Sequence, residues 1–178
     1  MIVGQKVNLR LFTEADLSEF LKLTGNLKNR GEYWPVFLHA ETKLRKQYAE
    51  DGLWGEQFGR MAITDQQNNM LGEIYFFKGP IHTDGYEVAY QIFRPEDRGK
   101  GYTTEALRLF VDYLFLLKPI NRLQVSIIPG NTASRKVAEK CGFQYEGRLR
   151  GVFFVRGKFA DLEMFSILRK EWETTYKP

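Results

Sequence analysis

The sequence is poor in cysteine and in long apolar runs. Cysteine occurs once, at position 141, so no disulfide can form within the chain. The longest near-continuous apolar stretch, Tyr113 to Leu117, is far shorter than the roughly 20 residues that a membrane-spanning helix needs. The start, Met1 to Lys6, has no apolar run of signal-peptide length. We therefore expect a cytoplasmic protein that is not anchored to a membrane.

Long blocks of one charge and clusters of metal-binding residues are also missing. The 26 Lys and Arg residues exceed the 22 Asp and Glu residues by only four, and they are scattered. Such a pattern is not typical of nucleic-acid binding, whereas a modest positive balance fits an anionic cofactor. The two histidines, His39 and His82, have no Cys, Asp or Glu at metal-ligand spacing. We predict no nucleic-acid partner and no metal.

The 178 residues with 43% hydrophobic content predict one domain, residues 1–178, with a single sizeable core. Alternating apolar residues predict strands, and apolar residues three or four apart predict helices. The predicted strands are 7–12, 60–64, 70–77, 87–93, 123–127, 144–155 and 159–168. The predicted helices start near Thr13, Thr104 and Asn131, with a weaker indication around Leu44 and Tyr48. This order predicts an α/β (α+β mixed) fold, a mixed sheet flanked by helices.

Two glycines lie between the strand ending near Phe93 and the helix that follows it. Glycines allow successive backbone N–H groups to point at one anion, and the start of a helix adds free N–H groups. Thr104 stands where a dinucleotide fingerprint has its third glycine, and the spacing is not that of a P-loop. The alternative is an ordinary glycine turn. The predicted pyrophosphate-binding residues are Arg98, Gly99, Lys100, Gly101, Tyr102 and Thr103.

A second motif follows the next predicted strand and strengthens this interpretation. It consists of Pro129–Ser134 and, at the end of the helix, Glu139–Phe143. Together with Gly99–Ala106 and the opening Leu9–Leu17, it resembles the GNAT superfamily of acetyl-CoA-dependent N-acetyltransferases. Within that superfamily the chain is most similar to the RimJ/RimL type, known for acetylating protein N-termini. The resemblance covers nearly the whole chain and is weakest over residues 25–58.

The resemblance implies a twisted, largely antiparallel mixed sheet and acetyl-CoA as acyl donor. It implies that the loop amides bind the pyrophosphate of coenzyme A, and that the strand end at Ile92 and Phe93 runs beside the pantetheine arm. It further implies that the side-chain amide of Asn131 bonds the pantetheine, and that Ser134 lies near the thioester sulfur.

The sequence departs from the family pattern at two positions. Glu96 stands where the superfamily often has Arg or Gln, so we expect the backbone and Arg98 to hold the pyrophosphate. Ala138 stands where many members carry a tyrosine acid. Ser134 inherits the role of acid by position, although a serine is a weak acid unless it is polarised.

Several residues are candidates for the base that takes the amine proton. Glu87, at the start of the strand leading into the loop, is the first choice, because the family often uses a carboxylate in that region. Asp161 and Glu163 are alternatives, and Glu87 could instead be an ordinary surface carboxylate. Cys141 shares an apolar helical face, which favours a buried structural thiol over a nucleophile.

We therefore predict acetyl transfer from acetyl-CoA to a primary amine by direct attack on the thioester. The acceptor is a protein N-terminus or a small amine, and a homodimer is one assembly that the resemblance allows. The alternative is a non-catalytic acyl-CoA-binding module; a ribosome- or RNA-associated protein is a third hypothesis, which rests on charge alone. Five aromatic residues either line an acceptor pocket or pack locally: Tyr33, Trp34, Phe37, Trp54 and Phe58.

Overall fold

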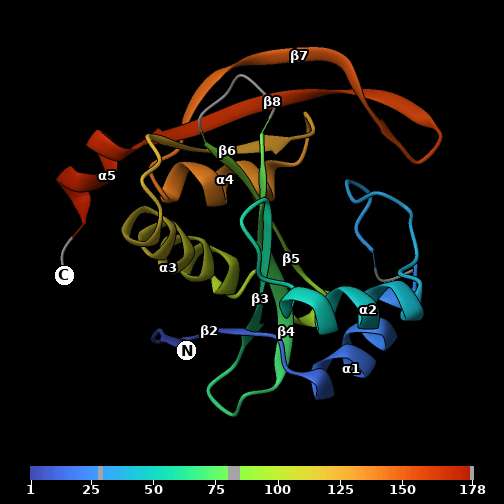
Figure 1. Ribbon diagram of the computed structural model, residues 1–178. Coiled ribbons are helices and arrows are strands. Elements are labelled where there is room, and N and C mark those ends of the chain that lie inside the picture. Colours follow the sequence, from blue (N-terminus) through green and yellow to red (C-terminus); the bar gives the residue numbers. More distant parts are fainter. Residues whose placement is uncertain (28–29, 80–84, 177–178) are drawn as a thin grey trace.

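The computed structural model describes residues 1–27, 30–79 and 85–176. In this part of the chain a single sheet of eight strands is flanked by helices (Figure 1). The strands are β1 (Ile2–Val3), β2 (Asn8–Leu11), β3 (Phe58–Thr64), β4 (Met70–Lys78), β5 (Tyr86–Ile92), β6 (Arg122–Ile127), β7 (Gln144–Val155) and β8 (Lys158–Leu168). The helices are α1 (Glu14–Gly25), α2 (Glu41–Asp51), the short 3-10 helix η1 (Pro95–Asp97), α3 (Tyr102–Leu117), α4 (Thr132–Lys140) and α5 (Arg169–Thr175).

The sheet is mixed but largely antiparallel. Its strand order is β1-β2-β3-β4-β5-β6-β8-β7, and each neighbouring pair is antiparallel except β5 and β6. The predicted fold class is thereby confirmed. The two predicted C-terminal strands match β7 and β8, which are joined where Arg156 and Gly157 take positive φ angles of 50° and 81°.

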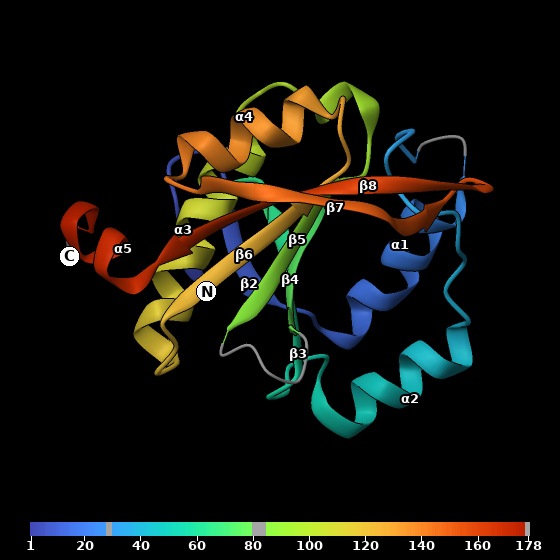
Figure 2. The same cartoon turned by 90° about the horizontal axis from the view of Figure 1, so that it is seen from above.

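Helices cover both faces of the sheet: α3 and α4 lie on one side, and α1 and α2 on the other (Figures 1 and 2). Successive side chains of a strand point to opposite faces, so the central strands supply both cores. On β3, Met61 and Ile63 belong to the larger core, which includes α3, whereas Ala62 belongs to the smaller core with α1. The two faces therefore hold two apolar cores, where the sequence analysis predicted one.

The spacing of apolar residues in the sequence predicts one buried side of α3, formed by Ala106, Phe110, Tyr113, Leu114 and Leu117. The structure differs at the C-terminal end of this stripe. Phe110 and Leu114 are fully buried as predicted, but Leu117 is 48% exposed. The reason is α5, which the sequence analysis did not predict. Its Trp172 stacks on Phe115 with ring centroids 5.1 Å apart, so the buried face turns toward Phe115 in the last turns of α3.

The sequence predicts one turn at Asp65–Asn69 and a second turn region between Gly79 and Gly85. The first of these turns, between β3 and β4, is present. One carboxylate oxygen of Asp65 accepts the backbone N–H groups of Gln67 and Asn69 at 2.9 and 2.8 Å, and Asn68 takes a positive φ of 68°. These are the side-chain and backbone features expected of Asx-type turn residues. The second predicted turn region, between Gly79 and Gly85, falls largely outside the described residues.

Candidate active site

The parallel strands β5 and β6 are paired over a very short length. The register joins Tyr86 to Leu123 and Glu87 to Gln124, although β5 continues to Ile92 and β6 to Ile127. The described residues show no further pairing between these two strands, so their facing backbone groups need other partners. Carboxyl ends of adjacent parallel strands are a common place for ligands. We call this region the β5–β6 separation.

The loop between η1 and α3 has the backbone shape that its glycines predict. Gly99 and Gly101 take φ angles of 77° and 85°, which glycine adopts without strain. No atom of the described residues lies within 4 Å of the place where Gly99 would carry a Cβ. Tyr102 and Thr103 then form the start of α3, whose first N–H groups have no partner within the helix. The loop is therefore shaped to receive an anion such as a pyrophosphate.

Lys6, in the segment between β1 and β2 at one edge of the sheet, lies beside this loop. Its Nζ donates to the carbonyl oxygen of Lys100 at 3.3 Å and lies 3.3 Å from the place of a Cβ on Gly101. The carboxylate of Glu105 holds this segment by accepting the N–H groups of Lys6 and its two neighbours at 2.7 to 3.0 Å. Sequence reasoning missed Lys6 because 94 residues separate it from the loop and nothing local marks it.

The basic side chains of the loop itself contact protein groups. Arg98 donates to the carbonyl oxygens of Ile92 and Phe93, each at 3.3 Å, and Lys100 pairs with Asp97 at 3.1 Å. The guanidinium thus ties the loop to the end of β5. A carbonyl oxygen has two acceptor positions, so Ile92 and Phe93 retain the capacity to accept one further hydrogen bond each.

Asn131 and Ser134 lie at the start of α4, as the sequence predicts. Asn131 is the N-cap residue, and its Oδ1 accepts the backbone N–H of Ser134 at 3.1 Å. The helix thereby uses the oxygen of the amide. A contact with pantetheine would accordingly be made by its NH2 group.

Tyr90, on β5, is a site residue that sequence reasoning missed. Its hydroxyl lies 3.0 Å from Ser134 Oγ and 3.3 Å from the carbonyl oxygen of the same serine. Burial raises the pKa of Tyr90 to about 12, although the hydrogen bond to Ser134 opposes this rise. The phenol therefore stays protonated near neutral pH and can donate to Ser134. The sequence placed Tyr90 on the face of Val88 and Ile92, but the contact with α4 spans 44 residues.

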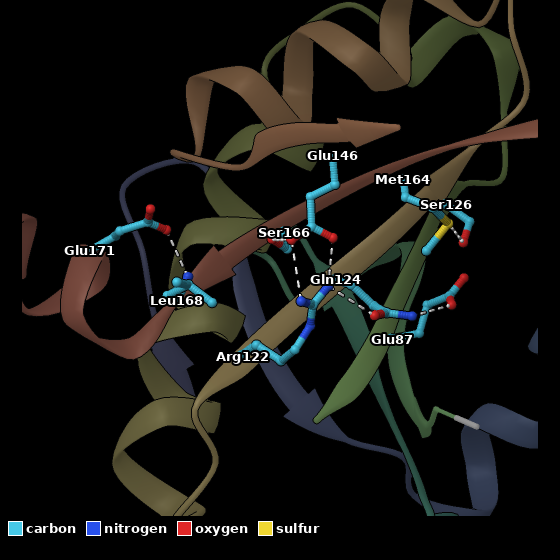
Figure 3. A network of polar contacts seen from close by, with 9 residues as sticks. All are labelled: Glu87, Arg122, Gln124, Ser126, Glu146, Met164, Ser166, Leu168 and Glu171. Atoms are coloured by element: carbon cyan, nitrogen blue, oxygen red, sulfur yellow. Dashed lines mark hydrogen bonds and ion pairs between the residues drawn. The ribbon is translucent and has the colours of Figure 1, made fainter. Parts of the chain in front are cut away.

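Glu87 lies on the other face of the sheet, in a polar network (Figure 3). Its Oε2 accepts a hydrogen bond from Gln124 Nε2 at 3.1 Å. Gln124 in turn accepts from Arg122 at 3.3 Å, and Arg122 pairs with Glu146 at 2.8 Å. The neutral amide of Gln124 therefore orients Glu87 without neutralising its charge.

The two alternative carboxylates are engaged with β7. Glu163 is buried, accepts from Arg148 at 2.8 Å and lies 3.9 Å from Arg135 of α4. Asp161 accepts the N–H of Gly151 at 2.8 Å. In the register of β8, Glu163 faces Ile127 of β6, whose side chain belongs to the core beneath α3. Glu163 is therefore on the face opposite to Glu87.

Cys141 is mostly buried and donates to the carbonyl oxygen of Thr104 at 3.3 Å. Burial raises the pKa of the Cys141 thiol to about 11. A thiol held protonated in this way is a poor nucleophile, in agreement with a structural role. Ala138, at the position of the family tyrosine, is fully buried, so this position of α4 offers no hydroxyl to the site.

The five aromatic residues of the least family-like segment do not act together. Trp54 packs edge-on against Phe76, with ring centroids 5.2 Å apart, in the larger core. Phe37 and Phe58 instead line an open hollow of about 560 Å³, together with His39, Lys43, Arg60 and Tyr75. The hollow lies on the face of the sheet that α1 and α2 cover. Trp54 therefore packs locally, whereas an acceptor pocket at the hollow beside Phe37 and Phe58 stays a prediction.

Within the described residues, no group of three or more His, Cys, Asp and Glu side chains is arranged to hold a metal ion; His82 lies outside them. No helix in this part of the chain is long and apolar enough to cross a membrane.

Comparison with known proteins places this geometry in a family. The family model described as Acetyltransferase (GNAT) domain matches residues 6–144. The chain therefore belongs to the GNAT acetyltransferases. It is an acetyl-CoA-dependent N-acetyltransferase that acetylates an amine, and the loop and β5–β6 separation described above fit the phosphates and the extended arm of this donor.

Several relatives are similar over almost their whole length. The chain is 39% identical to the putative ribosomal N-acetyltransferase YdaF of Bacillus subtilis, covering 96% of both chains. It is 23% identical to a spermidine N(1)-acetyltransferase of Vibrio cholerae, covering 96% of this chain and 97% of that one. The crystal structure of a Vibrio cholerae spermidine N-acetyltransferase with CoA and spermine superimposes with a TM-score of 0.81 at 22% identity, covering 94% of this chain and 98% of that chain. This last similarity establishes the fold.

We expect Gly101→Ala to weaken acetyl-CoA binding about tenfold. A Cβ at φ 85° adds roughly 1–2 kcal/mol of strain and stands 3.3 Å from Lys6 Nζ, so the loop must change shape. Gly151→Ala is the matched control, because Gly151 also has a positive φ (59°) but lies in β7. Calorimetric titration with acetyl-CoA should give equal Kd values for the Gly151 variant and the unaltered protein. Equal weakening in both variants would argue against a phosphate-binding loop.

Proposed function

We propose that this protein, as a single domain of the RimJ/RimL-like branch, transfers the acetyl group by direct attack of a primary amine on the thioester. The acceptor is a protein N-terminus or a small amine. The observation that carries the proposal is the end of β5–β6 pairing after Glu87 and Gln124. In this proposal the thioester lies in the β5–β6 separation, with Ser134 and Tyr90 on one face of the sheet and Glu87 on the other.

The reaction makes three demands on these residues. The ammonium must lose a proton, the tetrahedral oxyanion must be stabilised, and the thiolate must be protonated or solvated as it leaves. When donor and acceptor are bound together, no covalent enzyme intermediate is needed. The nitrogen lone pair forms the new C–N bond, the C–S bond breaks, and the sulfur departs with its electron pair.

Glu87 is the proposed base. Within the described residues its side chain accepts a single hydrogen bond, from an uncharged amide. One carboxylate oxygen is therefore left to take the ammonium proton directly or through a water. Asp161 and Glu163 already bind backbone or arginine donors, which makes them weaker candidates.

Ser134 and Tyr90 are the residues proposed to protonate the leaving thiolate. The hydroxyl of Tyr90 lies 3.0 Å from Ser134 Oγ, and either atom can be the donor. When Tyr90 donates to Oγ, the serine proton becomes more acidic and is directed to the sulfur. Tyr90 thus compensates for the tyrosine that Ala138 replaces. It is a positioning residue, since it acts through Ser134.

We expect Ser134→Ala to lower kcat about 100-fold and Tyr90→Phe to lower it about tenfold, with little change in acetyl-CoA affinity. Because the two hydroxyls act as one unit, the double variant should be no slower than Ser134→Ala alone. The measurement is a double-mutant cycle on kcat, with release of free thiol as the readout. Effects that multiply in the double variant would show that Tyr90 does not act through Ser134.

Two relatives point to different acceptors. One is named as a putative ribosomal N-acetyltransferase and the other as a spermidine N(1)-acetyltransferase. For this chain both classes belong to the proposal. A screen with short peptides and small amines, reading free thiol released from acetyl-CoA, separates them.

The sequence left a non-catalytic acyl-CoA-binding module as the alternative. Ala138 favours it, whereas membership of an acetyltransferase family argues against it. Such a protein would bind acetyl-CoA but release no coenzyme A with any amine in the screen. Turnover with any acceptor class, lost in the Ser134 and Tyr90 variants, would exclude this alternative.

A further inference from the structure

The hollow between α2 and the sheet carries more positive charge than its acids neutralise. On its floor, Arg60 Nε lies 2.9 Å from Glu73 Oε2, at an angle that makes no hydrogen bond. The second oxygen of Glu73 accepts a hydrogen bond from Gln91. This buried pair is neutral overall. Lys43, on the rim, adds a positive charge, and the described residues contain no ion pair that involves it.

Arg30 does not line the hollow but adds a second positive charge beside it, and it is more than nine-tenths buried, with 7% of its surface exposed. Its Nε and Nη2 atoms donate to the carbonyl oxygen of Thr24, each at 3.2 Å. Its guanidinium carbon lies 4.6 Å from the ring centroid of Phe37, which lines the hollow. The Nη1 atom is buried and has no hydrogen-bond partner within the described residues. A charged donor of this kind requires an acceptor.

His39 marks the same electrostatic environment. Burial, with the charges of Arg60 and Arg30, lowers the pKa of His39 to about 4. The ring is therefore neutral near pH 7. Its Nε2 atom is buried without a hydrogen-bond partner in the described part of the chain. His39 lines the hollow, so this nitrogen and Arg30 Nη1 are two unsatisfied polar atoms in or beside it.

The register of the sheet aligns this hollow with the reaction centre. Arg60 of β3 lies opposite Tyr75 of β4, which lies opposite Ala89 of β5. Glu87 is two residues from Ala89 and therefore shares its face. Neighbouring strands are about 4.8 Å apart, so the floor of the hollow is about 10 Å from β5. One extended small molecule can span this distance.

We propose that the hollow binds an anionic group of the acceptor, so that the acceptor is a primary amine carrying a carboxylate about 10 Å from its reacting nitrogen. This inference rests on the proposed function and specifies its substrate. A carboxylate would accept from Arg30 Nη1, and the rings of Phe37 and Phe58 would cover its apolar arm. A polyamine would place a second ammonium beside Arg30 and Lys43, where like charges repel it. The hollow therefore selects against the acceptors named for the spermidine acetyltransferases.

The first experiment compares linear amines of equal length that differ only at the remote end. One member is an ω-amino carboxylate, one is the diamine, and one ends in a methyl group. We expect kcat/KM for the carboxylate to exceed that for the diamine at least tenfold, with an optimum at a chain length near the 10 Å span. A diamine preferred over the carboxylate at each length would overturn the proposal.

Variants then test whether Arg30 causes the preference for the carboxylate over the diamine. Arg30→Gln should reduce the carboxylate-to-diamine ratio of kcat/KM by about tenfold to a hundredfold, the range for a hydrogen bond to a charged group. Arg45→Gln is the matched control, because Arg45 lies on α2 and is bound to Glu41 and Ser18. Its ratio should remain unchanged. A ratio that is the same in Arg30→Gln as in the unaltered protein would also overturn the proposal.

Two further measurements separate this inference from the proposed function. Calorimetric binding of the ω-amino carboxylate to the CoA-saturated protein tests the hollow without turnover, and Arg30→Gln should weaken that binding. Binding without release of thiol would support an anion site in the hollow and contradict the proposed catalysis. Acetylation of diamines alone would support catalysis and contradict the anion site. Peptides with an acidic side chain near the N-terminus form the last arm. A preference for the carboxylate in either series supports the proposal that the acceptor is anionic. The series in which it occurs shows whether the acceptor is a peptide or a small amine.

Discussion

Glu87→Gln should lower kcat/KM about 100-fold at pH 7, within the range that general base catalysis contributes. Glutamine can accept the hydrogen bond that Gln124 donates, so the β5–β6 junction should stay intact. It cannot take a proton from the ammonium. The acceptor amine, whose ordinary pKa lies above 7, then reaches the thioester mostly in its protonated and unreactive form.

The pH dependence distinguishes this role from a structural one. Above the pKa of the acceptor amine, the substrate arrives without its extra proton, so the deficit of the Glu87 variant should shrink. Glu146→Gln is the matched control, because Glu146 lies on the same polar network but pairs with Arg122 (Figure 3). Its profile should follow that of the unaltered protein. A deficit that stays constant across the pH range, or an equal loss in the Glu146 variant, would remove Glu87 from the reaction.

Gly72→Ala should lower the free energy of unfolding by about 3–5 kcal/mol, at the upper end of what single substitutions cost. A Cβ on Gly72 would lie 2.1 Å from the carbonyl oxygen of Gln91 and 3.1 Å from Ile92 Cδ1. The obstacle is backbone, so no side-chain rotation relieves the clash. Strands β4 and β5 would have to move apart, and β5 carries both Glu87 and Tyr90.

Denaturant unfolding followed by tryptophan fluorescence measures this effect. Gly25→Ala is the matched control, because nothing lies within 4 Å of its Cβ position and it ends helix α1. Alanine is favoured there over glycine, so we expect no loss and up to about 1 kcal/mol of gain. A Gly72 variant as stable as the Gly25 variant would mean that the sheet accommodates a side chain between β4 and β5.

The sequence predicted those parts of the molecule that short-range patterns determine. Alternation of apolar residues located β7 and β8 within a residue, and Asn131 was identified as the cap of α4 because capping is a local interaction. The glycine loop was predicted for the same reason, since Gly99 and Gly101 set their own backbone angles. The acetyltransferase resemblance then supplied the donor, which no local pattern could name.

Contacts between distant segments were not predictable in this way. Lys6 reaches the loop across 94 residues, and Tyr90 meets Ser134 only because the end of β5 faces α4. Arg30 is a candidate binding residue because its Nη1 atom has no hydrogen-bond partner within the described residues. This can be recognised only from the three-dimensional surroundings of the side chain. The burial of Leu117 was wrongly predicted for a related reason, because a helix that begins at residue 169 determines which side of α3 is buried.

The brief pairing of β5 with β6 also bears on how this protein avoids association with other chains. Unpaired strand backbone at the outside of a sheet is a template for aggregation. Here the unpaired groups face each other in the middle of an eight-stranded sheet, where β4 and β8 already occupy the outer sides of the two strands. The protein can thus present strand-like hydrogen-bonding capacity to a slender ligand at this place. A foreign polypeptide strand, with its side chains above and below, finds no open edge between β5 and β6, since the edges of the sheet are β1 and β7.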